Sequence, residues 1–241
     1  MRPSIGGPKE IDTLSHIRIG QGQEIVYLHG WGCSKEIFSL GDSPSFCRTA
    51  PDMYGFGDTP APMVPVDLQY YADGVMDLFR HYGIEDAVVV GHSFGARVAI
   101  RLAATTDRVA GLVLVGAAGL KPRRGPRYYA RVARAKCCRV LGLPQPKGSV
   151  DYAKLQGSMR QTFKNVVHTY QEREVKSIRC PVLLVWGSLD DQTPLYMLHR
   201  FERLLPHSRT VLMEGCGHFC FLEQPRRFAD LVDQFAFGLC I

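Results

Sequence analysis

The sequence has no apolar run long enough to cross a membrane. A membrane-spanning helix needs roughly 20 consecutive apolar residues, and no segment of the 241-residue chain reaches that length. The first residues, Met1-Arg2-Pro3-Ser4-Ile5-Gly6-Gly7, also lack the apolar stretch of a secretory signal. We therefore expect no membrane span and a cytoplasmic location. The apolar fraction of 46% and charged fraction of 22% are typical of a globular protein that forms one large domain with a small insertion.

The eight cysteines include no Cys-x-x-Cys pair and no zinc-ribbon spacing. This favours reduced thiols, several of them buried, in a reducing compartment. One alternative is a metal site, because Cys216 and Cys220 flank His218, and Cys33 follows a loop that contains His29. Nothing in the spacing demands a metal, so we expect no metal ligands.

Acidic residues are absent from residues 118–150, a segment that contains nine lysines and arginines. The whole chain has a net charge of +6, so the remainder is net negative. No recognised nucleic-acid-binding motif accompanies these charges, and we expect no nucleic-acid partner. Four arginines of the segment recur at helical spacing and would share one face: Arg124, Arg127, Arg131 and Arg134. This face is either a solvated surface that serves only solubility, or a surface that attracts an anionic substrate or an acidic partner.

Apolar strands alternate with helical patterns along most of the chain. Continuous apolar strands separated by helices predict an α/β fold with a mostly parallel central sheet and helices on both faces. The stretch 118–178 breaks the alternation and is interpreted as an insertion. Strands are predicted at 24–28, 46–50, 87–90, 109–115, 182–186 and 209–213, and helices at 67–82, 94–106, 194–205 and 225–237.

The most informative motif is Gly91-His92-Ser93-Phe94-Gly95, between an apolar strand and a helix. A serine between two glycines at a strand-to-helix turn is typical of a nucleophile elbow. Such a turn projects the hydroxyl above the sheet and aims the free N–H groups of the helix start at the same place. The N–H of Phe94 is therefore one predicted oxyanion donor. The N–H of Trp31, in the loop His29-Gly30-Trp31-Gly32, is the other.

A serine nucleophile needs a base, and the base needs an orienting acid. His218 is the predicted base, because it follows the last strand in a glycine-containing loop. His92 adjoins Ser93 but is expected to point elsewhere. Asp190 and Asp191 both follow the strand 182–186, and either could instead cap the next helix. The loop 116–119 has no carboxylate and cannot supply the acid.

The chain resembles an α/β-hydrolase over nearly its whole length. Five segments in order carry the resemblance: His29-Gly30-Trp31-Gly32, Asp52-Met53-Tyr54-Gly55-Phe56-Gly57-Asp58, Gly91-His92-Ser93-Phe94-Gly95, Trp186-Gly187-Ser188-Leu189-Asp190 and Gly217-His218-Phe219. The resemblance implies that the acid is Asp190, four residues after the tryptophan. Two segments, Gly148-Ser149-Val150-Asp151-Tyr152 and Gly157-Ser158-Met159-Arg160, resemble a subgroup found in gut Firmicutes.

The resemblance also implies a domain division. Residues 1–117 and 179–241 would form the hydrolase core, and residues 118–178 a basic helical cap inserted between strands 6 and 7. Two departures from the family pattern stand out: Ala96 replaces a second glycine after the elbow, and the short N-terminal part suggests a missing or rudimentary first edge strand. Tyr128 and Val132 of the cap are candidate substrate contacts. His29 is either a further substrate contact or a structural residue.

The predicted function is that of a serine hydrolase acting on a small carboxylic ester, without a metal or organic cofactor. Ser93 would attack, His218 would transfer the proton and Asp190 would orient His218. Four other activities use related machinery and remain alternatives. They are hydrolysis of a carbon–carbon bond in a diketone, thioester hydrolysis, peptide hydrolysis and cofactor-free peroxidation. A non-catalytic ligand-binding protein of the same fold is a further alternative. The partner is expected to be a small-molecule substrate, and its identity and the oligomeric state are left open.

Overall fold

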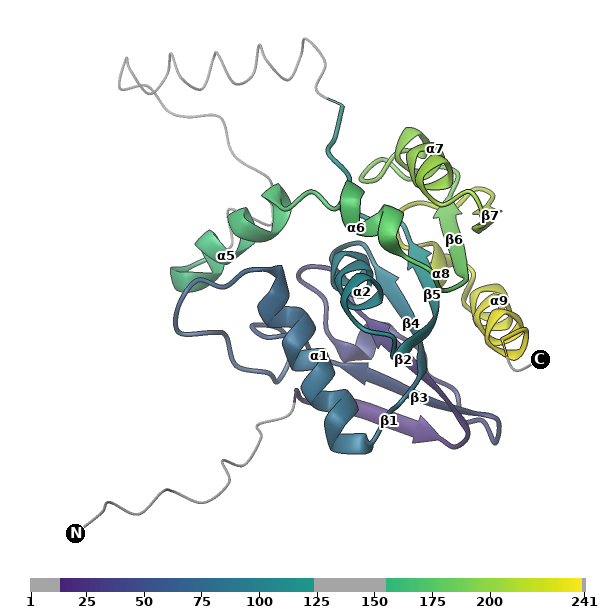
Figure 1. Cartoon of the computed structure of the whole chain (residues 1–241), viewed down its shortest axis with the longest axis horizontal. Helices are drawn as coiled ribbons and strands as arrows, with labels where there is room; N and C mark the ends of the chain where they lie inside the picture. Colours follow the sequence, from purple (N-terminus) through teal and green to yellow (C-terminus); the bar gives the residue numbers. More distant parts are fainter. Residues whose placement is uncertain (1–13, 124–154, 240–241) are drawn as a thin grey trace.

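A seven-stranded β-sheet lies at the centre of the computed structural model, which describes residues 14–123 and 155–239 (Figure 1). Its strand order is β1-β3-β2-β4-β5-β6-β7, and every neighbouring pair is parallel except β1 with β3. The strands are β1 His16–Gly20, β2 Gln23–Leu28, β3 Phe46–Pro51, β4 Ala87–His92, β5 Val109–Val115, β6 Val182–Gly187 and β7 Arg209–Met213. The predicted α/β fold class is confirmed.

Helices cover both faces of this sheet (Figure 1). Residues of α1, α2 and α7 join a core on one face, and residues of α8 and α9 join a core on the other. The described helices are η1 Lys35–Ile37, α1 Leu68–Tyr82, α2 Phe94–Thr105, α5 Gly157–His168, α6 Glu172–Ser177, α7 Leu195–Leu204, α8 Cys220–Glu223 and α9 Pro225–Phe237. The four predicted helices match α1, α2, α7 and α9 to within one residue at each end.

The inner strands are apolar throughout because both of their faces are buried. In β4, for example, Val88 and Val90 point into the core beneath α9, whereas Val89 points into the core beneath α1 and α2. All six residues of β4 and all six of β6 are buried. This is why continuous apolar runs in the sequence marked these strands.

β1 is an edge strand of the described sheet, and the sequence predicted no strand there. The expectation that the first edge strand is missing or rudimentary stays a prediction, because residues 1–13 lie outside the described residues. β1 pairs antiparallel with β3 over five residues, from His16 opposite Pro51 to Gly20 opposite Cys47. All five residues of β1 are only partly buried. An edge strand has one neighbour and one solvated side, so it needs no continuous apolar run, and its sequence signal was correspondingly weak.

The predicted insertion lies between β5 and β6, so five strands precede it in the described part of the chain. Its placement between a sixth and a seventh strand is not confirmed. Residues 124–154 lie outside the described residues, and with them Tyr128, Val132 and the arginine face. The division into a core domain and a cap therefore stays a prediction.

The described end of this insertion is attached closely to the core. Three side chains of α5 hydrogen-bond the segment before α1: the Ser158 hydroxyl donates to the carbonyl of Pro62, the Thr162 hydroxyl accepts from the amide of Val66, and the Asn165 amide donates to the carbonyl of Val66. α5 is thus held against the segment that precedes α1.

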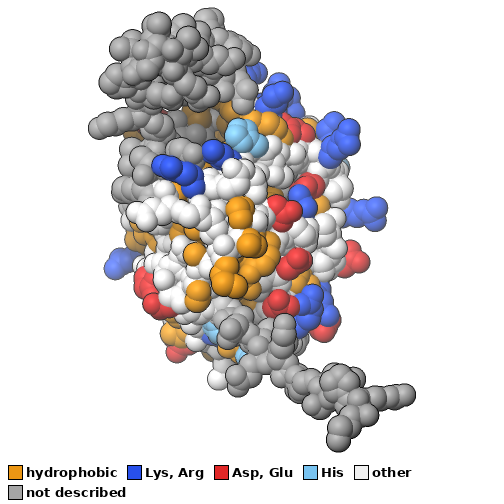
Figure 2. All heavy atoms as spheres, turned by 90° about the vertical axis from the view of Figure 1, so that its left-hand side faces the viewer, with side chains coloured by type: hydrophobic (Ala, Val, Ile, Leu, Met, Phe, Trp, Pro, Cys, Tyr) orange, Lys and Arg blue, Asp and Glu red, His pale blue; other side chains and the backbone are white. Residues whose placement is uncertain are grey.

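Figure 2 views the side of the molecule where α5 and the segment before α1 lie in Figure 1, and it shows hydrophobic side chains gathered there. Met63, Val64 and Tyr70 are exposed large hydrophobic residues of that segment and of α1. None of the described helices is both long and apolar enough to span a bilayer.

Candidate active site

Ser93 occupies the turn between β4 and α2, and its backbone is strained. It has φ 51° and ψ −104°, and within the described ranges it is the one non-glycine residue with positive φ. Such a conformation costs on the order of 1–3 kcal/mol and persists only when the surroundings impose it. Here the amide of Ser93 donates to the carbonyl of Val115, and its carbonyl accepts from the amide of Ala118. The turn is therefore locked to the end of β5.

Close backbone approach explains the two glycines of the elbow. A Cβ atom on Gly95 would lie 2.0 Å from the carbonyl oxygen of Leu28, at the end of β2. A Cβ atom on Gly91 would lie 2.6 Å from the Cα of Ala96. Both contacts are with backbone or Cα atoms that cannot rotate away. The glycines let α2 start directly above β2 and β4, so that its first N–H groups lie beside Ser93.

His218 and Asp190 form a buried pair. The Nδ1 atom of His218 lies 2.8 Å from Oδ2 of Asp190, and both residues are about 95% buried. The two come from the loops after β7 and β6, which the parallel sheet brings to the same edge. Gly116 leaves room for this pair, because a Cβ atom at that position would lie only 3.1 Å from both Asp190 Oδ2 and His218 Nδ1.

The carboxylate of Asp190 is fixed by several donors. Its Oδ1 accepts from the amides of Gln192 and Thr193, and its Oδ2 accepts from the hydroxyl of Thr193 as well as facing His218. Burial tends to raise the pKa of Asp190, but the hydrogen bonds from His218 and Thr193 outweigh it and the pKa is lowered. The group is held as a carboxylate. Asp191 is exposed, so the carboxylate that contacts the histidine is that of Asp190.

His92 supports the loop that carries His218. It is buried, and its Nε2 donates to the carbonyl oxygen of His218 across 3.0 Å. The two imidazole rings lie 4.7 Å apart. Burial, assisted by the nearby His218, lowers the pKa of His92 to about 3, so the ring is neutral and carries its proton on Nε2. It does not point away from the site, as the sequence suggested, but braces it.

The loop after β2 lies close to Ser93. A Cβ atom on Gly30 would lie 3.7 Å from the Cβ of Ser93, and 2.8 Å from Nδ1 of His92. The next residue in this loop is Trp31, whose amide is the predicted oxyanion donor. Neither the Trp31 amide nor the Phe94 amide donates to an acceptor in the described parts of the chain. Both remain available to a ligand.

His29 is a structural residue of this loop. Its side chain is fully buried, with Nδ1 donating to the carbonyl of Gly30 and Nε2 accepting from the amide of Met53. Burial lowers its pKa, which keeps the ring neutral. Because both ring nitrogens are engaged, the geometry favours the structural role over a substrate contact.

Aromatic rings surround Trp31. Its ring lies 5.0 Å from that of Phe56, 5.1 Å from that of Phe94 and 5.0 Å from that of Phe163, each at a near-perpendicular angle. Edge-to-face packing of this kind adds about 0.5–1.5 kcal/mol per pair beyond area burial. Phe163 belongs to α5, so the expected cap region contributes an aromatic ring that packs against Trp31. No sequence pattern pointed to Phe163, because a lone aromatic residue on a helix is commonly a core residue.

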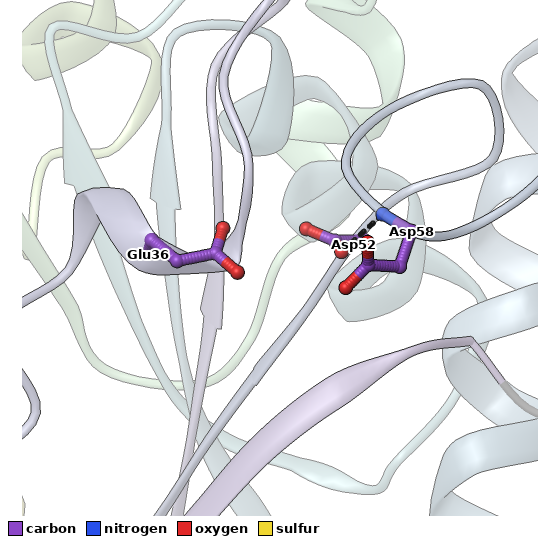
Figure 3. Close-up of side chains that lie close together, drawn as sticks. All are labelled: Glu36, Asp52 and Asp58. Carbon is purple, nitrogen blue, oxygen red and sulfur yellow. Dashed lines mark hydrogen bonds between the residues drawn. The ribbon is translucent and has the colours of Figure 1, made fainter.

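A cluster of charged groups joins η1 to the loop that follows β3 (Figure 3). The carboxylates of Glu36, Asp52 and Asp58 could together hold a cation, since their oxygens lie within 4.8 Å of one another. The ammonium group of Lys35 lies among them, 2.6 Å from Asp52 Oδ2 and 2.6 Å from Asp58 Oδ2. The cation of this cluster is therefore a lysine. The cysteine–histidine metal site that the sequence left open is not among the metal-ligand clusters of the described residues.

Comparisons with known proteins show what this chain resembles. Residues 25–231 match the model of the alpha/beta hydrolase family. An AB hydrolase superfamily protein, YisY, of Bacillus subtilis is 25% identical, with 94% of this chain and 98% of the relative covered. A pimeloyl-[acyl-carrier protein] methyl ester esterase of Photorhabdus laumondii is 26% identical over 89% of this chain and 92% of its own. Among solved structures, an esterase from Exiguobacterium antarcticum superposes with a TM-score of 0.74 at 19% identity, with 92% and 95% covered.

Proposed function

From the premise that this chain belongs to the α/β-hydrolase family, we propose that it is a serine hydrolase that cleaves a small carboxylic ester through an acyl-enzyme intermediate. The observation that carries the proposal is the Asp190–His218 hydrogen bond of 2.8 Å at the same sheet edge as the strained Ser93. The esterase among the sequence relatives supports an ester as the substrate.

The first half of the reaction is acylation. The Oγ of Ser93 attacks the carbonyl carbon of the ester while Nε2 of His218 takes its proton. Asp190 holds the proton on Nδ1 of His218, so that Nε2 is free to act as base, and its negative charge stabilises the imidazolium. His218 then gives the proton to the leaving alcohol. The acyl group stays on Ser93.

The amides of Trp31 and Phe94 stabilise the negative charge that develops on the carbonyl oxygen. Hydrogen-bond donors that are fixed before the reaction act without reorganisation, and losing one typically costs about 10²–10³-fold in turnover. Water activated by His218 then hydrolyses the acyl-enzyme. No step of the proposed reaction uses a metal or an organic cofactor.

The test is the hydrolysis of p-nitrophenyl esters of increasing acyl length by the wild type and by Ser93→Ala. The substitution should leave the fold intact, as measured by circular dichroism, and lower kcat by about 10⁶-fold. If Ser93→Ala kept more than a few per cent of the wild-type kcat, Ser93 would not be the nucleophile.

The substrate panel also separates the alternatives. A vinylogous diketone tests carbon–carbon hydrolysis, and an acyl thioester tests thioesterase activity on the same triad. The ester should give the largest kcat/KM. A wild-type protein that binds these compounds without turning any of them over would instead be a ligand-binding member of the family.

A further inference from the structure

The loop that carries Trp31 is fixed at both ends to the loop that follows β3. At one end, the amide of Met53 donates to Nε2 of His29. At the other end, the amide of Lys35 donates to Oδ1 of Asp52, across 2.7 Å. Trp31 lies between these two attachments, so the position of its amide depends on both.

Asp52 is the centre of the second attachment. Its side chain is fully buried, and its Oδ2 accepts from the amide of Asp58 and from the ammonium of Lys35. Gly57 is needed at this point, because a Cβ atom there would lie 2.2 Å from the carboxylate, and its φ is +52°. The loop after β3 is thus wrapped around one carboxylate.

Lys35 supplies the compensating charge. Its side chain is only 9% exposed, and its ammonium lies 2.6 Å from both Asp52 and Asp58, and 3.2 Å from the hydroxyl of Ser15. Glu36 lies at the rim, 3.3 Å away. The hydrogen bonds to Asp52 and Asp58 raise the pKa of Lys35 above its ordinary value, so the group is charged at neutral pH. A buried carboxylate without this partner would be strongly destabilising.

We propose that Lys35 is a positioning residue for the oxyanion hole: its ammonium lies among the Glu36, Asp52 and Asp58 carboxylates and thereby fixes the loop that carries the proposed oxyanion donor, the Trp31 amide. The inference rests on the proposed function, since it assigns the Trp31 amide its role there. In this role the Lys35 ammonium neutralises the clustered carboxylates and links the two loops, as a structural metal ion would. Lys35 touches no substrate, and it acts only through the loop.

The test is Lys35→Met, which keeps the length of the side chain and removes the charge. A displaced oxyanion donor weakens transition-state binding more than substrate binding. The kcat for the best p-nitrophenyl ester should fall by about 10–100-fold, while KM changes by less than about threefold. Inhibition by a trifluoromethyl ketone, whose adduct carries an oxyanion, should weaken by the same factor as kcat/KM. Lys176→Met, the same change at an exposed lysine of α6, should leave all three quantities unchanged.

A second variant guards against a simple loss of folding. Lys35→Met combined with Asp52→Asn removes both charges, so that no unpaired carboxylate is buried. This double variant should fold, by circular dichroism and urea unfolding, and should keep the low kcat. Wild-type kcat in either folded variant would overturn the proposal. Failure of both variants to fold would also overturn it, because the cluster would then hold the whole fold and not the loop.

Two further measurements separate the role of Lys35 from a bound metal ion and from the proposed function. Loss of wild-type activity on dialysis against EDTA would overturn the proposal, because the carboxylates would then hold a metal ion. Ser93→Ala is assayed beside the Lys35 variants. Activity that survives in Ser93→Ala contradicts the proposed function, whereas wild-type kcat in Lys35→Met beside an inactive Ser93→Ala contradicts only the role of Lys35.

Discussion

At the scale of single residues, Asp190 and Asp191 are neighbours with different surroundings. Asp190 is buried and bonded to His218, Gln192 and Thr193, whereas Asp191 is exposed. Asp190→Asn should lower kcat by about 10⁴-fold, because an amide donor facing Nδ1 favours the wrong tautomer of the base. Asp191→Asn is the matched control and should change kcat by less than about threefold. Steady-state kinetics on one ester decides between them, and a larger loss in Asp191→Asn would contradict the assignment.

Burial of His92 should make the free energy of unfolding depend on pH. Its pKa is lowered from the ordinary 6.5 to about 3, with burial as the main cause. Between these values the unfolded chain binds a proton that the folded chain does not, so the free energy of unfolding falls as the pH falls. The contribution of one such group reaches about 1.4 kcal/mol per pH unit.

Urea unfolding of the wild type and of His92→Asn at several values between pH 4 and pH 6.5 measures this effect. The variant should be less stable at neutral pH, but its free energy of unfolding should fall less steeply with falling pH. His207→Asn, at an exposed histidine, should follow the wild-type slope. Parallel slopes for the wild type and His92→Asn would show that His92 is not held neutral in the folded chain.

The sequence indicated the residues that recur in a recognisable local pattern. Ser93, His218 and Asp190 each follow a strand at a turn, and the parallel sheet brings such turns to one edge. The sequence could not indicate Lys35 or the bracing role of His92. Their contacts are with residues 17 and 126 positions away, and no sequence pattern shows which distant residue each of them meets.

At the scale of elements, Arg97 joins the helix after the nucleophile to α5. It is buried, and its guanidinium donates to the carbonyls of Val166 and Thr169 at the end of α5. Burial lowers its pKa to about 10, yet it remains charged at neutral pH. The carbonyls at a helix C-terminus favour a cation there, so Arg97 is stabilised without a carboxylate in contact.

Arg97→Met should lower the free energy of unfolding by about 1–3 kcal/mol, since it leaves buried carbonyls of α5 without donors. Because α5 carries Phe163 against Trp31, the same variant should raise KM. Urea unfolding and steady-state kinetics measure the two effects. Arg173→Met, at an exposed arginine of α6, is the control. Unchanged stability in Arg97→Met would contradict the view that α5 is fixed to the core through this residue.

The elements themselves were predictable to different degrees. Inner strands such as β5 are buried on both faces and show as continuous apolar runs, and the amphipathic helices α1, α7 and α9 show a period of 3.6 residues. β1 has neither signal because it lies at the sheet edge. The attachment of α5 was not predictable either, since it depends on polar side chains that reach the carbonyls of Pro62 and Val66.

At the scale of the whole molecule, the candidate active site depends on the ends of parallel strands that meet at one sheet edge. β2 leads to the Trp31 loop, β4 to Ser93, β6 to Asp190 and β7 to His218. Each strand is ordinary, and the site arises from their adjacency. The family membership and the fold are therefore the premise of the function, and the chemistry rests on whether Ser93 is an activated nucleophile.

Covalent labelling tests that claim most directly. The full-length wild type is treated with a fluorophosphonate, digested and analysed by mass spectrometry. We expect one stoichiometric adduct, on the peptide that contains Ser93. It should be absent in Ser93→Ala, and its formation should be markedly slower in Asp190→Asn. A wild-type protein that stays unlabelled under conditions that label a control serine esterase, or an adduct that persists in Ser93→Ala, would contradict the claim that Ser93 is an activated nucleophile.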